Sequence, residues 1–405
     1  MKIAILTSGT LPVPAVKGGA VENLTDFYLE YNEERKLHDM TVYSVYDPKV
    51  SESPLLGGEK THFHYVRDRA LGYRVRRYLF RYSCRSAGHN HYTAFFLQEI
   101  AAHVRRQKYD CIIVENRPAF ILPLSKVTDA RLVLHLHNDF LNSSTPRCQE
   151  ILDACDSVIT VSDYIKRRVL TVNSMCPYVT TVYNGIDLDR FRKPDRDSMR
   201  RALHFDKDDF VLLFSGRLVP EKGIKELVEA MTLIGDGRIK LLVLGGKSYG
   251  NDDTEDSFIG ELKRLAEAVP GRIVFTGFVG YEQVPRYLSA ADVCVAPSVW
   301  DEPLGISVIE GMAASLPVIA TRSGGIPEEV TPQCSILLDR SPAAQAVARG
   351  GRAAKPNLPQ QIADAAVYLF GHPEKRQAMA RVSARRAKLF GKRAYAENFL
   401  NALQQ

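Results

Sequence analysis

The sequence has no apolar run long enough to cross a membrane. Its longest apolar stretches, such as residues 211–214 and 241–244, have the length of a strand, whereas a membrane-spanning helix needs about 20 apolar residues. The N-terminal run 2–6 passes into Thr-Ser-Gly too soon to supply the apolar core of a signal peptide. We therefore expect a cytoplasmic protein whose N-terminal residues form a buried strand.

The cysteines give no sign of a disulfide framework or a zinc site. The seven cysteines are odd in number, scattered from Cys84 to Cys334, and never spaced as C-x-x-C, the spacing that often marks a pair of zinc ligands. Unpaired thiols are typical of a reducing compartment, which agrees with a cytoplasmic location.

One segment has almost no acidic residues. Between positions 67 and 85 there are seven arginines and a single acid. Apolar residues recur there at helical spacing, which predicts a basic amphipathic helix, and beside them stand Arg74, Arg77, Arg81 and Arg85. Two interpretations stay open: an ordinary surface helix, or contact with an anionic partner, either the inner face of a membrane or the phosphate of a lipid-linked acceptor.

The G-x-G-x-x-G pattern of dinucleotide-binding dehydrogenases is missing as well. The chain has instead a regular alternation of short aliphatic runs with longer amphipathic stretches, which is typical of α/β proteins built from βαβ units. A second cycle of this alternation begins near Phe210. We expect two Rossmann-like domains facing a central cleft, formed by residues 1–185 and 186–375, and a C-terminal helix, 376–405, that packs back on the first domain.

The individual elements follow from the same alternation. Strands are expected at 3–7, 41–45, 111–115, 131–136, 157–161, 210–214, 239–244, 272–275, 292–296 and 317–320. Helices are expected at about 20–35, 73–83, 93–107, 148–154, 163–171, 222–233, 257–268, 281–289, 305–314, 359–370 and 374–403. The turn signal Asn184-Gly185 and the charged stretch 189–201 indicate the linker between the domains.

Two carboxylates stand eight positions apart around a short turn in the second half. Glu302 precedes a Pro-Leu-Gly turn, and Glu310 follows within a helical run from about 306 to 314. Because a helix start exposes unpaired N–H groups and a positive dipole end, Gly305 and Ile306 are placed to hold an anion such as a diphosphate. The two acids can accept hydrogen bonds from two separate sets of hydroxyls. This layout fits a nucleotide-sugar site.

A second polar segment directly follows the expected strand 210–214, at the edge where open parallel sheets bind ligands. Gly216 allows the backbone to pass close to a ligand, while Arg217 and Lys222 can converge on one diphosphate. The alternative is that Lys222 merely begins a solvated helix. Its occurrence together with the Glu302–Glu310 segment favours the binding role.

Together these motifs resemble the retaining glycosyltransferases of family 4, which have the GT-B fold. The resemblance covers landmarks of both halves and is stronger in the second. It rests on Gly216-Arg217-Leu218, Glu221-Lys222-Gly223, Glu302-Pro303-Leu304-Gly305, Glu310-Gly311-Met312-Ala313, Pro317-Val318-Ile319-Ala320, Gly324-Gly325, Asn184-Gly185-Ile186-Asp187 and Gly18-Gly19-Ala20-Val21-Glu22.

The resemblance implies a role for each of these residues. Arg217 and Lys222 would hold the donor diphosphate and stabilise the charge that develops as the sugar leaves. Glu302 would contact the transferred sugar, and Glu310 would accept the ribose hydroxyls. Backbone groups would complete the donor site, as a phosphate cradle at Leu304, Gly305 and Ile306 and as a uracil-binding loop around Phe278 and Val279. The family needs no divalent ion, so we expect no metal and no cofactor beyond the donor.

Two features of the first half are weaker signals. The glycine turn Gly18-Gly19, between a strand and a helix, could present amides to phosphate. His135 and His137 end a strand and point to the same face, but no third ligand stands at a suitable spacing, so a metal site is not expected. The alternative is a pair of hydrogen-bonded structural histidines. The resemblance implies that one of them, here assigned as His137, touches the donor sugar.

The sequence therefore predicts a retaining, metal-independent hexosyltransferase (EC 2.4). Its expected donor is a nucleotide diphosphate sugar, with UDP the expected nucleotide, and its expected acceptor is a glycan in surface polysaccharide or lipopolysaccharide biosynthesis. Asn138 and Asp139 could face that acceptor. Two alternatives stay open: a non-catalytic sugar-nucleotide-binding protein of the same fold, or a sugar-nucleotide epimerase that uses Asp139 or Glu115 as acid or base.

Overall fold

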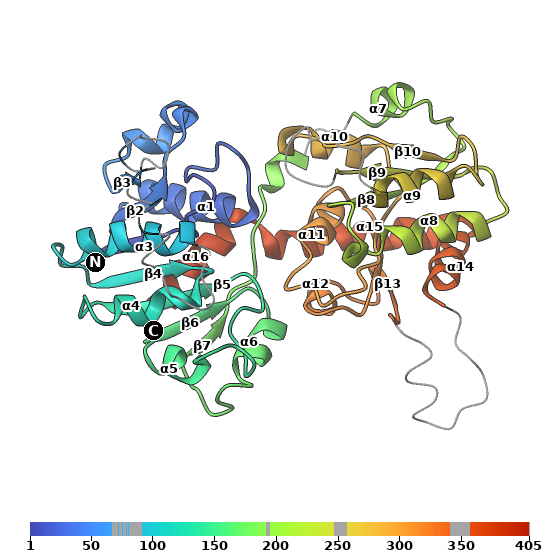
Figure 1. Cartoon of the computed structure of the whole chain (residues 1–405). Coiled ribbons are helices and arrows are strands. Elements are labelled where there is room, and N and C mark those ends of the chain that lie inside the picture. The colour runs from blue at the N-terminus through green and yellow to red at the C-terminus, as the bar shows by residue number, and fades with distance from the viewer. Residues whose placement is uncertain are drawn as a thin grey trace. The chain divides into compact units, whose positions relative to one another are not determined.

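The computed structural model describes residues 1–66, 72, 75, 78, 80, 91–191, 195–246, 257–340 and 357–404. The chain forms two compact units, Met1–Gly185 with Lys392–Gln405, and Ile186–Gly391. Each unit is built around its own parallel sheet (Figure 1).

The sheet of the first unit has seven strands in the order β3-β2-β1-β4-β5-β6-β7. All of its neighbouring strands pair in parallel. Because the strand order reverses between β1 and β4, their carboxyl ends form the switch point at which such sheets bind ligands. The strands are β1 (Lys2–Leu6), β2 (Asp39–Val45), β3 (Thr61–Val66), β4 (Cys111–Glu115), β5 (Arg131–Leu136), β6 (Ser157–Thr160) and β7 (Val179–Thr181).

Helices from both ends of the chain cover this sheet. Its helices are α1 (Ala20–Arg35), α3 (His91–Val104), α4 (Ile121–Leu124), α5 (Cys148–Asp153), α6 (Asp163–Val169) and α16 (Lys392–Ala402). In Figure 1 the C-terminal helix α16 lies beside α1, and the ring of Phe399 stacks on that of Tyr28 with centroids 4.5 Å apart. Apolar residues of both helices join those of β1, β4 and β5 in one core. The last residues of the chain are therefore part of the first unit's interior.

The second unit repeats the architecture with six strands in the order β10-β9-β8-β11-β12-β13, again all parallel. These strands are β8 (Phe210–Ser215), β9 (Ile239–Leu244), β10 (Ile273–Phe275), β11 (Val293–Ala296), β12 (Val318–Thr321) and β13 (Ser335–Leu338). The order reverses between β8 and β11. The loops after these two strands hold the two motifs that the sequence singled out.

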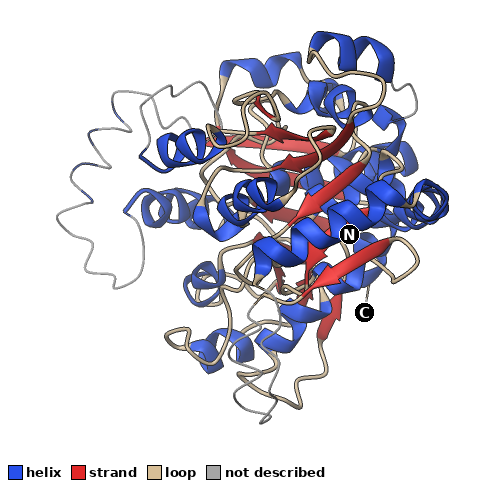
Figure 2. Cartoon of the chain, turned by 90° about the vertical axis from the view of Figure 1, so that its right-hand side faces the viewer, coloured by secondary structure: helices blue, strands red, loops and turns tan. Residues whose placement is uncertain are grey.

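Helices cover the strands of this unit too, as Figure 2 shows. They are α7 (Arg196–Ala202), α8 (Ile224–Leu233), α9 (Ser257–Ala266), α10 (Val284–Ser289), α11 (Ile306–Ala313), α12 (Ile326–Glu329), α14 (Leu358–Gly371) and α15 (Pro373–Ala387). Apolar residues of α8 and α14 pack with those of β8 and β9 in the main core. Short 3-10 turns occur in the two units at Pro48–Glu52, Pro54–Gly57, Pro118–Phe120, Leu188–Phe191, Pro220–Lys222, Tyr281–Gln283 and Lys388–Phe390.

The structure departs from the sequence-based expectation in three strands, in the three short helices α4, α7 and α12, and at one boundary. Three strands were not expected, because β3 alternates polar with aromatic residues while β7 and β13 are very short. The segment that joins the first unit begins at Lys392, not at 376, because α15 packs on α11 in the second unit. The expected helix 374–403 is accordingly broken, with Gly391 extended between its two parts. Most of the expected helix 73–83 lies outside the described residues.

None of the helices in the described part of the chain combines the length and the apolar character needed to cross a membrane.

Two helical glycines should respond in opposite ways to the same substitution. A Cβ on Gly311, inside α11, would lie 2.6 Å from Cβ and Sγ of Cys294 on β11, whereas one on the exposed Gly260 of α9 would meet no atom within 4 Å. We expect Gly311→Ala to lower the free energy of unfolding by about 1–3 kcal/mol through overpacking, and Gly260→Ala to raise it by up to about 1 kcal/mol. Urea denaturation of both variants measures this, and an unchanged or stabilised Gly311→Ala would show that α11 can move away from β11.

Candidate functional site

The loop after β8 brings two cations to the carboxyl edge of the second sheet. Its backbone is tied to the neighbouring strand, since the Gly216 N–H donates to the Leu244 carbonyl at 3.0 Å. Arg217 then lies exposed, and Lys222 ends a 3-10 turn and is half-buried. Gly223 follows in the left-handed region (φ 69°), where glycine is strongly preferred. This glycine turns the chain into α8.

The side chain of Lys222 contacts Glu302, which lies 80 positions further along the chain. The Lys222 Nζ is 2.6 Å from the Glu302 Oε1, and the Ser298 hydroxyl donates to the same oxygen at 2.6 Å. Only 6% of the Glu302 side chain is exposed, and burying a carboxylate is costly unless it is paired and hydrogen-bonded, as it is here. The structure thus brings together the two motifs that the sequence placed in one site.

The glycine pair Gly324-Gly325, in the loop after β12, packs against the backbone of Glu302. The Gly325 N–H donates to the Glu302 carbonyl at 2.7 Å. Gly324 has a left-handed backbone (φ 51°), and any Cβ there would collide with the Glu302 backbone. The Ser323 hydroxyl donates to the Trp300 carbonyl. The loop after β12 therefore fixes the position of the loop after β11.

The N-terminus of α11 is occupied by a carboxyl group from the same chain. The Gly305 N–H, one of the amides expected to hold phosphate, donates to the Glu329 Oε1. Glu329 is fully buried at the end of α12, and its Oε2 has no hydrogen-bond partner among the described residues. Burial raises the pKa of Glu329 well above its usual value, which favours the protonated acid. Sequence analysis missed Glu329, although the acidic pair Glu328-Glu329 directly follows the Gly324-Gly325 motif.

Glu310 is buried in the middle of α11. Burial raises its pKa to about 7, against the opposing effect of the Arg190 guanidinium. Arg190, from the 3-10 turn Leu188–Phe191, packs over the Tyr281 ring with its guanidinium carbon 3.7 Å from the ring centroid. Arg190 was not expected in this neighbourhood, and its place just after the Asn184–Asp187 motif was the available signal. Glu310 therefore changes charge near neutral pH.

The loop after β10 lies at the same edge of the sheet. Gly277 adopts a left-handed conformation (φ 69°), and its carbonyl accepts from the Gly245 N–H at 3.0 Å. Phe278 is 43% exposed and Val279 is half-buried. This geometry leaves the Phe278 ring accessible, as a contact with a planar base would require.

In the first unit, Gly18 and Gly19 form a turn between β1 and α1. Both have positive φ, at 72° and 107°. A Cβ on Gly19 would collide with the Glu22 carboxylate, whereas one on Gly18 would meet nothing within 4 Å. Burial raises the pKa of Glu22 to about 7. The turn thus brings backbone amides and a titratable acid to the carboxyl edge of the first sheet.

His135 of β5 and His137, which directly follows the strand, both contact a buried carboxylate from the neighbouring strand β4. Glu115 ends β4 in register with His135, and its Oε2 lies 3.0 Å from His135 Nδ1 and 2.9 Å from His137 Nε2. All three side chains are buried, and their nearest ligand atoms lie within 4.8 Å of one another. The sequence-based argument that no third ligand stands near the histidines was therefore wrong, because strand pairing supplies it.

The charges of this cluster depend on one another. Burial alone would raise the pKa of Glu115, but the two imidazoles outweigh it and hold that pKa well below its usual range. Burial and the neighbouring His135 lower the pKa of His137 to about 4, against the opposing effect of Glu115. At neutral pH the group is therefore an anionic carboxylate beside a neutral His137.

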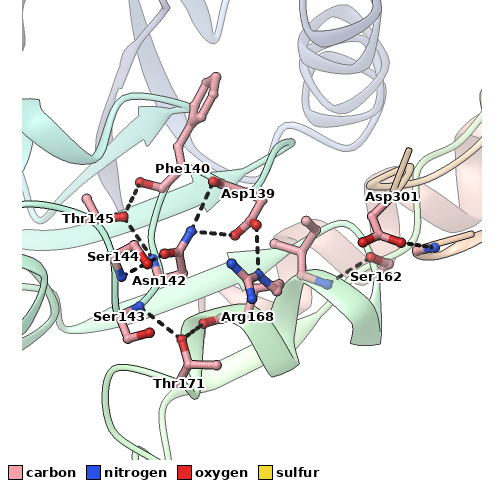
Figure 3. Close-up of polar contacts among 12 residues, drawn as sticks. Asp139, Phe140, Asn142, Ser143, Ser144, Thr145, Ser162, Arg168, Thr171 and Asp301 are labelled. Carbon is pink, nitrogen blue, oxygen red and sulfur yellow. Dashed lines mark hydrogen bonds and ion pairs between the residues drawn. The ribbon is translucent and has the colours of Figure 1, made fainter. Parts of the chain in front are cut away.

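Asp139 follows β5 and is held by two side chains, as Figure 3 shows. The Arg168 Nε donates to its Oδ2 at 2.7 Å, and the Asn142 Nδ2 donates to its Oδ1 at 2.9 Å. The Phe140 ring points away from this group and is 48% exposed. Asp139 is thus a paired carboxylate beside an accessible aromatic ring.

Some candidate residues lie outside the described part of the chain. They are Arg74, Arg77, Arg81 and Arg85 of the basic segment.

The raised pKa of Glu329 has a measurable consequence. Glu329→Gln keeps an acceptor for Gly305 but removes the ionisable group. Above pH ~4.5 the unfolded wild type releases this proton while the folded protein keeps it, so wild-type stability falls by up to about 1.4 kcal/mol per pH unit until the raised pKa is reached. We expect the variant to gain stability relative to wild type as the pH rises above ~4.5, measured by denaturant titration.

The control for this comparison is Glu374→Gln, on the exposed side of α15. It should show a constant difference from wild type over the same pH range. A constant difference for Glu329→Gln as well would mean that Glu329 is ionised in the folded protein.

Comparison with known proteins identifies the family. Residues 195–385 match the model of "Glycosyl transferases group 1", and residues 34–190 match that of "Glycosyltransferase Family 4". The chain is 30% identical over 344 residues to a protein of Bacillus subtilis named "Putative glycosyltransferase YtcC", covering 82% of this chain and 77% of that protein. It is 28% identical over 430 residues to the spore coat protein SA of the same organism, covering both chains in full.

Solved structures show the same fold. Anabaena HepE, crystallised with UDP and glucose, superposes with a TM-score of 0.71 at 20% identity, covering 100% of this chain and 99% of that one. WaaG, a glycosyltransferase involved in lipopolysaccharide biosynthesis, superposes with a TM-score of 0.66 at 14% identity, covering 98% of each chain. The chain therefore belongs to the group 1, family 4 glycosyltransferases and is a transferase (EC 2.4) of the GT-B fold.

Proposed function

We propose that this glycosyltransferase moves a hexose-type sugar from a UDP-linked donor to a glycan acceptor with retention at the anomeric carbon. The observation that carries the proposal is the contact of Lys222 with Glu302, which joins a cation for the diphosphate to a carboxylate for the sugar. HepE, with a similar fold, was crystallised with UDP-glucose, which supports the choice of nucleotide.

In this proposal, the donor diphosphate draws Lys222 away from Glu302. The phosphate oxygens offer Lys222 and Arg217 a doubly charged partner, and Glu302, still held by Ser298, is released to accept hydroxyls of the sugar. The helix dipole of α11 favours the same anion. Leu304 and Ile306 offer amides there, and phosphate competes with Glu329 for the Gly305 N–H.

The nucleoside end of the donor extends along α11. Glu310 accepts the ribose hydroxyls, and the loop of Phe278 and Val279 receives the uracil. Gly216 allows the backbone after β8 to approach the donor. For the first unit, we propose that the Gly19 N–H contacts the diphosphate and that His137 contacts the transferred sugar. The Gly18 N–H already donates to the Ala15 carbonyl at 2.8 Å.

Retention follows from attack on the side that the leaving group departs from. The bond between the anomeric carbon and the diphosphate breaks, the acceptor hydroxyl attacks from the same face, and the departing phosphate oxygen takes the acceptor proton. The products are the glycosylated acceptor and UDP. Arg217, Lys222 and helix-terminal amides supply the electrostatic stabilisation that a divalent ion supplies elsewhere, so we propose activity without a metal.

The proposed acceptor is a glycan in surface polysaccharide or lipopolysaccharide assembly. The "Lipopolysaccharide 1,2-N-acetylglucosaminetransferase" of Salmonella typhimurium is 28% identical over 230 residues, covering 56% of this chain. If the enzyme acts at the inner face of the membrane, anionic lipids there would attract the basic segment around Arg74 to Arg85. The epimerase alternative is disfavoured, because Glu115 has a lowered pKa and Asp139 is paired with Arg168.

The direct test of the proposal is a panel of UDP-, GDP- and ADP-sugars offered to the pure enzyme. We expect slow release of UDP from one UDP-sugar without acceptor, and the same rate in the presence of EDTA. Products are identified by mass, since transfer lengthens a glycan and epimerisation leaves the mass unchanged. Hydrolysis of a GDP- or ADP-sugar alone would contradict the choice of nucleotide, and loss of activity in EDTA would contradict metal independence.

Lys222→Ala should reduce kcat/KM for the donor by about 10²–10³, because it removes a cation from the developing negative charge. The matched control is Lys225→Ala, three residues further along, which loses only a partly exposed ion pair with Glu261 on the outside of α8. That variant should keep its turnover. Wild-type turnover by Lys222→Ala at saturating donor would overturn the diphosphate assignment.

The titration of Glu310 predicts a pH dependence of donor binding. Its pKa of about 7 makes it mostly protonated at pH 6 and mostly ionised at pH 8, and the carboxylate is the stronger acceptor for ribose hydroxyls. We expect the Kd of UDP-glucose, measured by calorimetry without acceptor, to fall about fivefold to tenfold between pH 6 and pH 8. Glu310→Gln should abolish this change, and an equal pH dependence in the variant would assign it to another group.

A further inference from the structure

Two consecutive residues at the end of β4 hold His137 from two directions. The Asn116 Oδ1 accepts a hydrogen bond from the His137 backbone N–H at 3.1 Å. The Glu115 Oε2 lies 2.9 Å from the His137 Nε2. One contact fixes the backbone at the point where β5 ends, and the other fixes the ring.

The backbone of Asn116 is shaped for this contact. It has a left-handed conformation (φ 55°), which asparagine tolerates better than most residues. Its own N–H donates to the His135 carbonyl at 2.7 Å. Asn116 thus makes hydrogen bonds to the backbone of both His135 and His137, and it is buried.

The position of the proton on the His137 ring follows from its partner. Only 1% of the Glu115 side chain is exposed, and its other oxygen, Oε1, accepts from the Tyr28 hydroxyl at 3.0 Å. An ionised carboxylate can only accept hydrogen bonds, so His137 must present Nε2–H to it. With the ring neutral, Nδ1 then keeps its lone pair, and it has no hydrogen-bond partner among the described residues.

We propose that Glu115 and Asn116 are positioning residues, which together hold the His137 ring in one orientation and one tautomer, protonated on Nε2, for its contact with the transferred sugar. The functional part of this inference rests on the proposed function. Orientation by a buried carboxylate is a general way to fix which imidazole nitrogen is protonated. Nδ1, which is buried in this structure, is thereby left as the ring's acceptor for the proposed contact with a sugar hydroxyl.

The groups packed around the cluster agree with a neutral ring. His135 faces the same carboxylate oxygen and lowers the pKa of His137, while Tyr28 from α1 donates to the other oxygen. Tyr395 from α16 is also buried nearby, and the Glu115 charge contributes to raising its pKa. Burial and these neighbours together favour a His137 ring without a positive charge.

A metal ion held by Glu115, His135 and His137 is the competing explanation for the same geometry. The hydrogen bond between His137 Nε2 and Glu115 Oε2 favours the positioning role. A metal ion at this place would need a lone pair from each of these two atoms, but the hydrogen bond already occupies them. The Tyr28 bond to Oε1 accounts for the rest of the carboxylate without an ion. Metal content is therefore one outcome of the test.

The first experiment compares Glu115→Gln with wild type. The amide has one accepting oxygen and an NH₂ group, so we expect His137 to lose its uniform Nε2–H tautomer, seen in the ¹⁵N chemical shifts of the imidazole nitrogens. Turnover of a UDP-sugar should fall tenfold or more, while the Kd of UDP, which lacks the sugar, should stay within twofold of wild type. Tyr28→Phe removes a hydrogen bond to the same carboxylate without touching His137, and it should keep both the tautomer and the turnover.

The second experiment isolates Asn116. Asn116→Gly keeps the left-handed backbone and deletes only the side-chain contact with the His137 N–H. We expect lower turnover and unchanged UDP binding, as for Glu115→Gln.

Three results would overturn the proposal. The first is an unchanged His137 tautomer in Glu115→Gln. The second is equal loss of turnover in Tyr28→Phe, which would show a purely structural role for the carboxylate. The third is a stoichiometric metal in the wild type that Glu115→Gln lacks. The ¹⁵N shifts are measured without substrate, so failure of the proposed function, seen as no UDP-sugar binding by wild type, is a separate result.

Discussion

The ion pair between Lys222 and Glu302 joins the two segments that we propose to bind the donor. It forms because β8 and β11 are neighbours in a parallel sheet, so the loops that follow them leave from the same edge. A buried carboxylate near a mobile ammonium is stable only with further hydrogen bonds, which Ser298 supplies. The packing of Gly324-Gly325 against the backbone of Glu302 then fixes the loop in place.

Three buried glutamates in this enzyme show three ways in which a protein accommodates a carboxyl group. Glu115 stays ionised because two imidazoles and a tyrosine hydroxyl surround it. Glu329 has a raised pKa, because its main partner is one backbone amide, which cannot offset the loss of hydration. Glu310 lies between these cases, with a pKa of about 7 and one guanidinium in its vicinity.

The first unit depends on residues from the far end of the chain. Phe399 of α16 stacks on Tyr28 and also lies against His135, with ring centroids 4.8 Å apart. Tyr28 in turn donates to Glu115. The surroundings of His135 therefore include a helix that begins only at Lys392, more than 250 positions further along the chain.

We could predict from the sequence alone the fold class, most of the strands, and the motifs around Arg217, Lys222, Glu302 and Glu310. These features are local: they depend on the period of apolar residues and on turn and helix-start chemistry, both visible in a short window. Four features became apparent only in the tertiary structure. Lys222 contacts Glu302, and Glu115 forms a cluster with the two histidines. Glu329 accepts from the N-terminus of α11, and the C-terminal segment that belongs to the first unit begins at Lys392. Each of these depends on strand order or on packing between distant segments, and on whether burial leaves a carboxyl group with partners. A linear pattern does not contain that information.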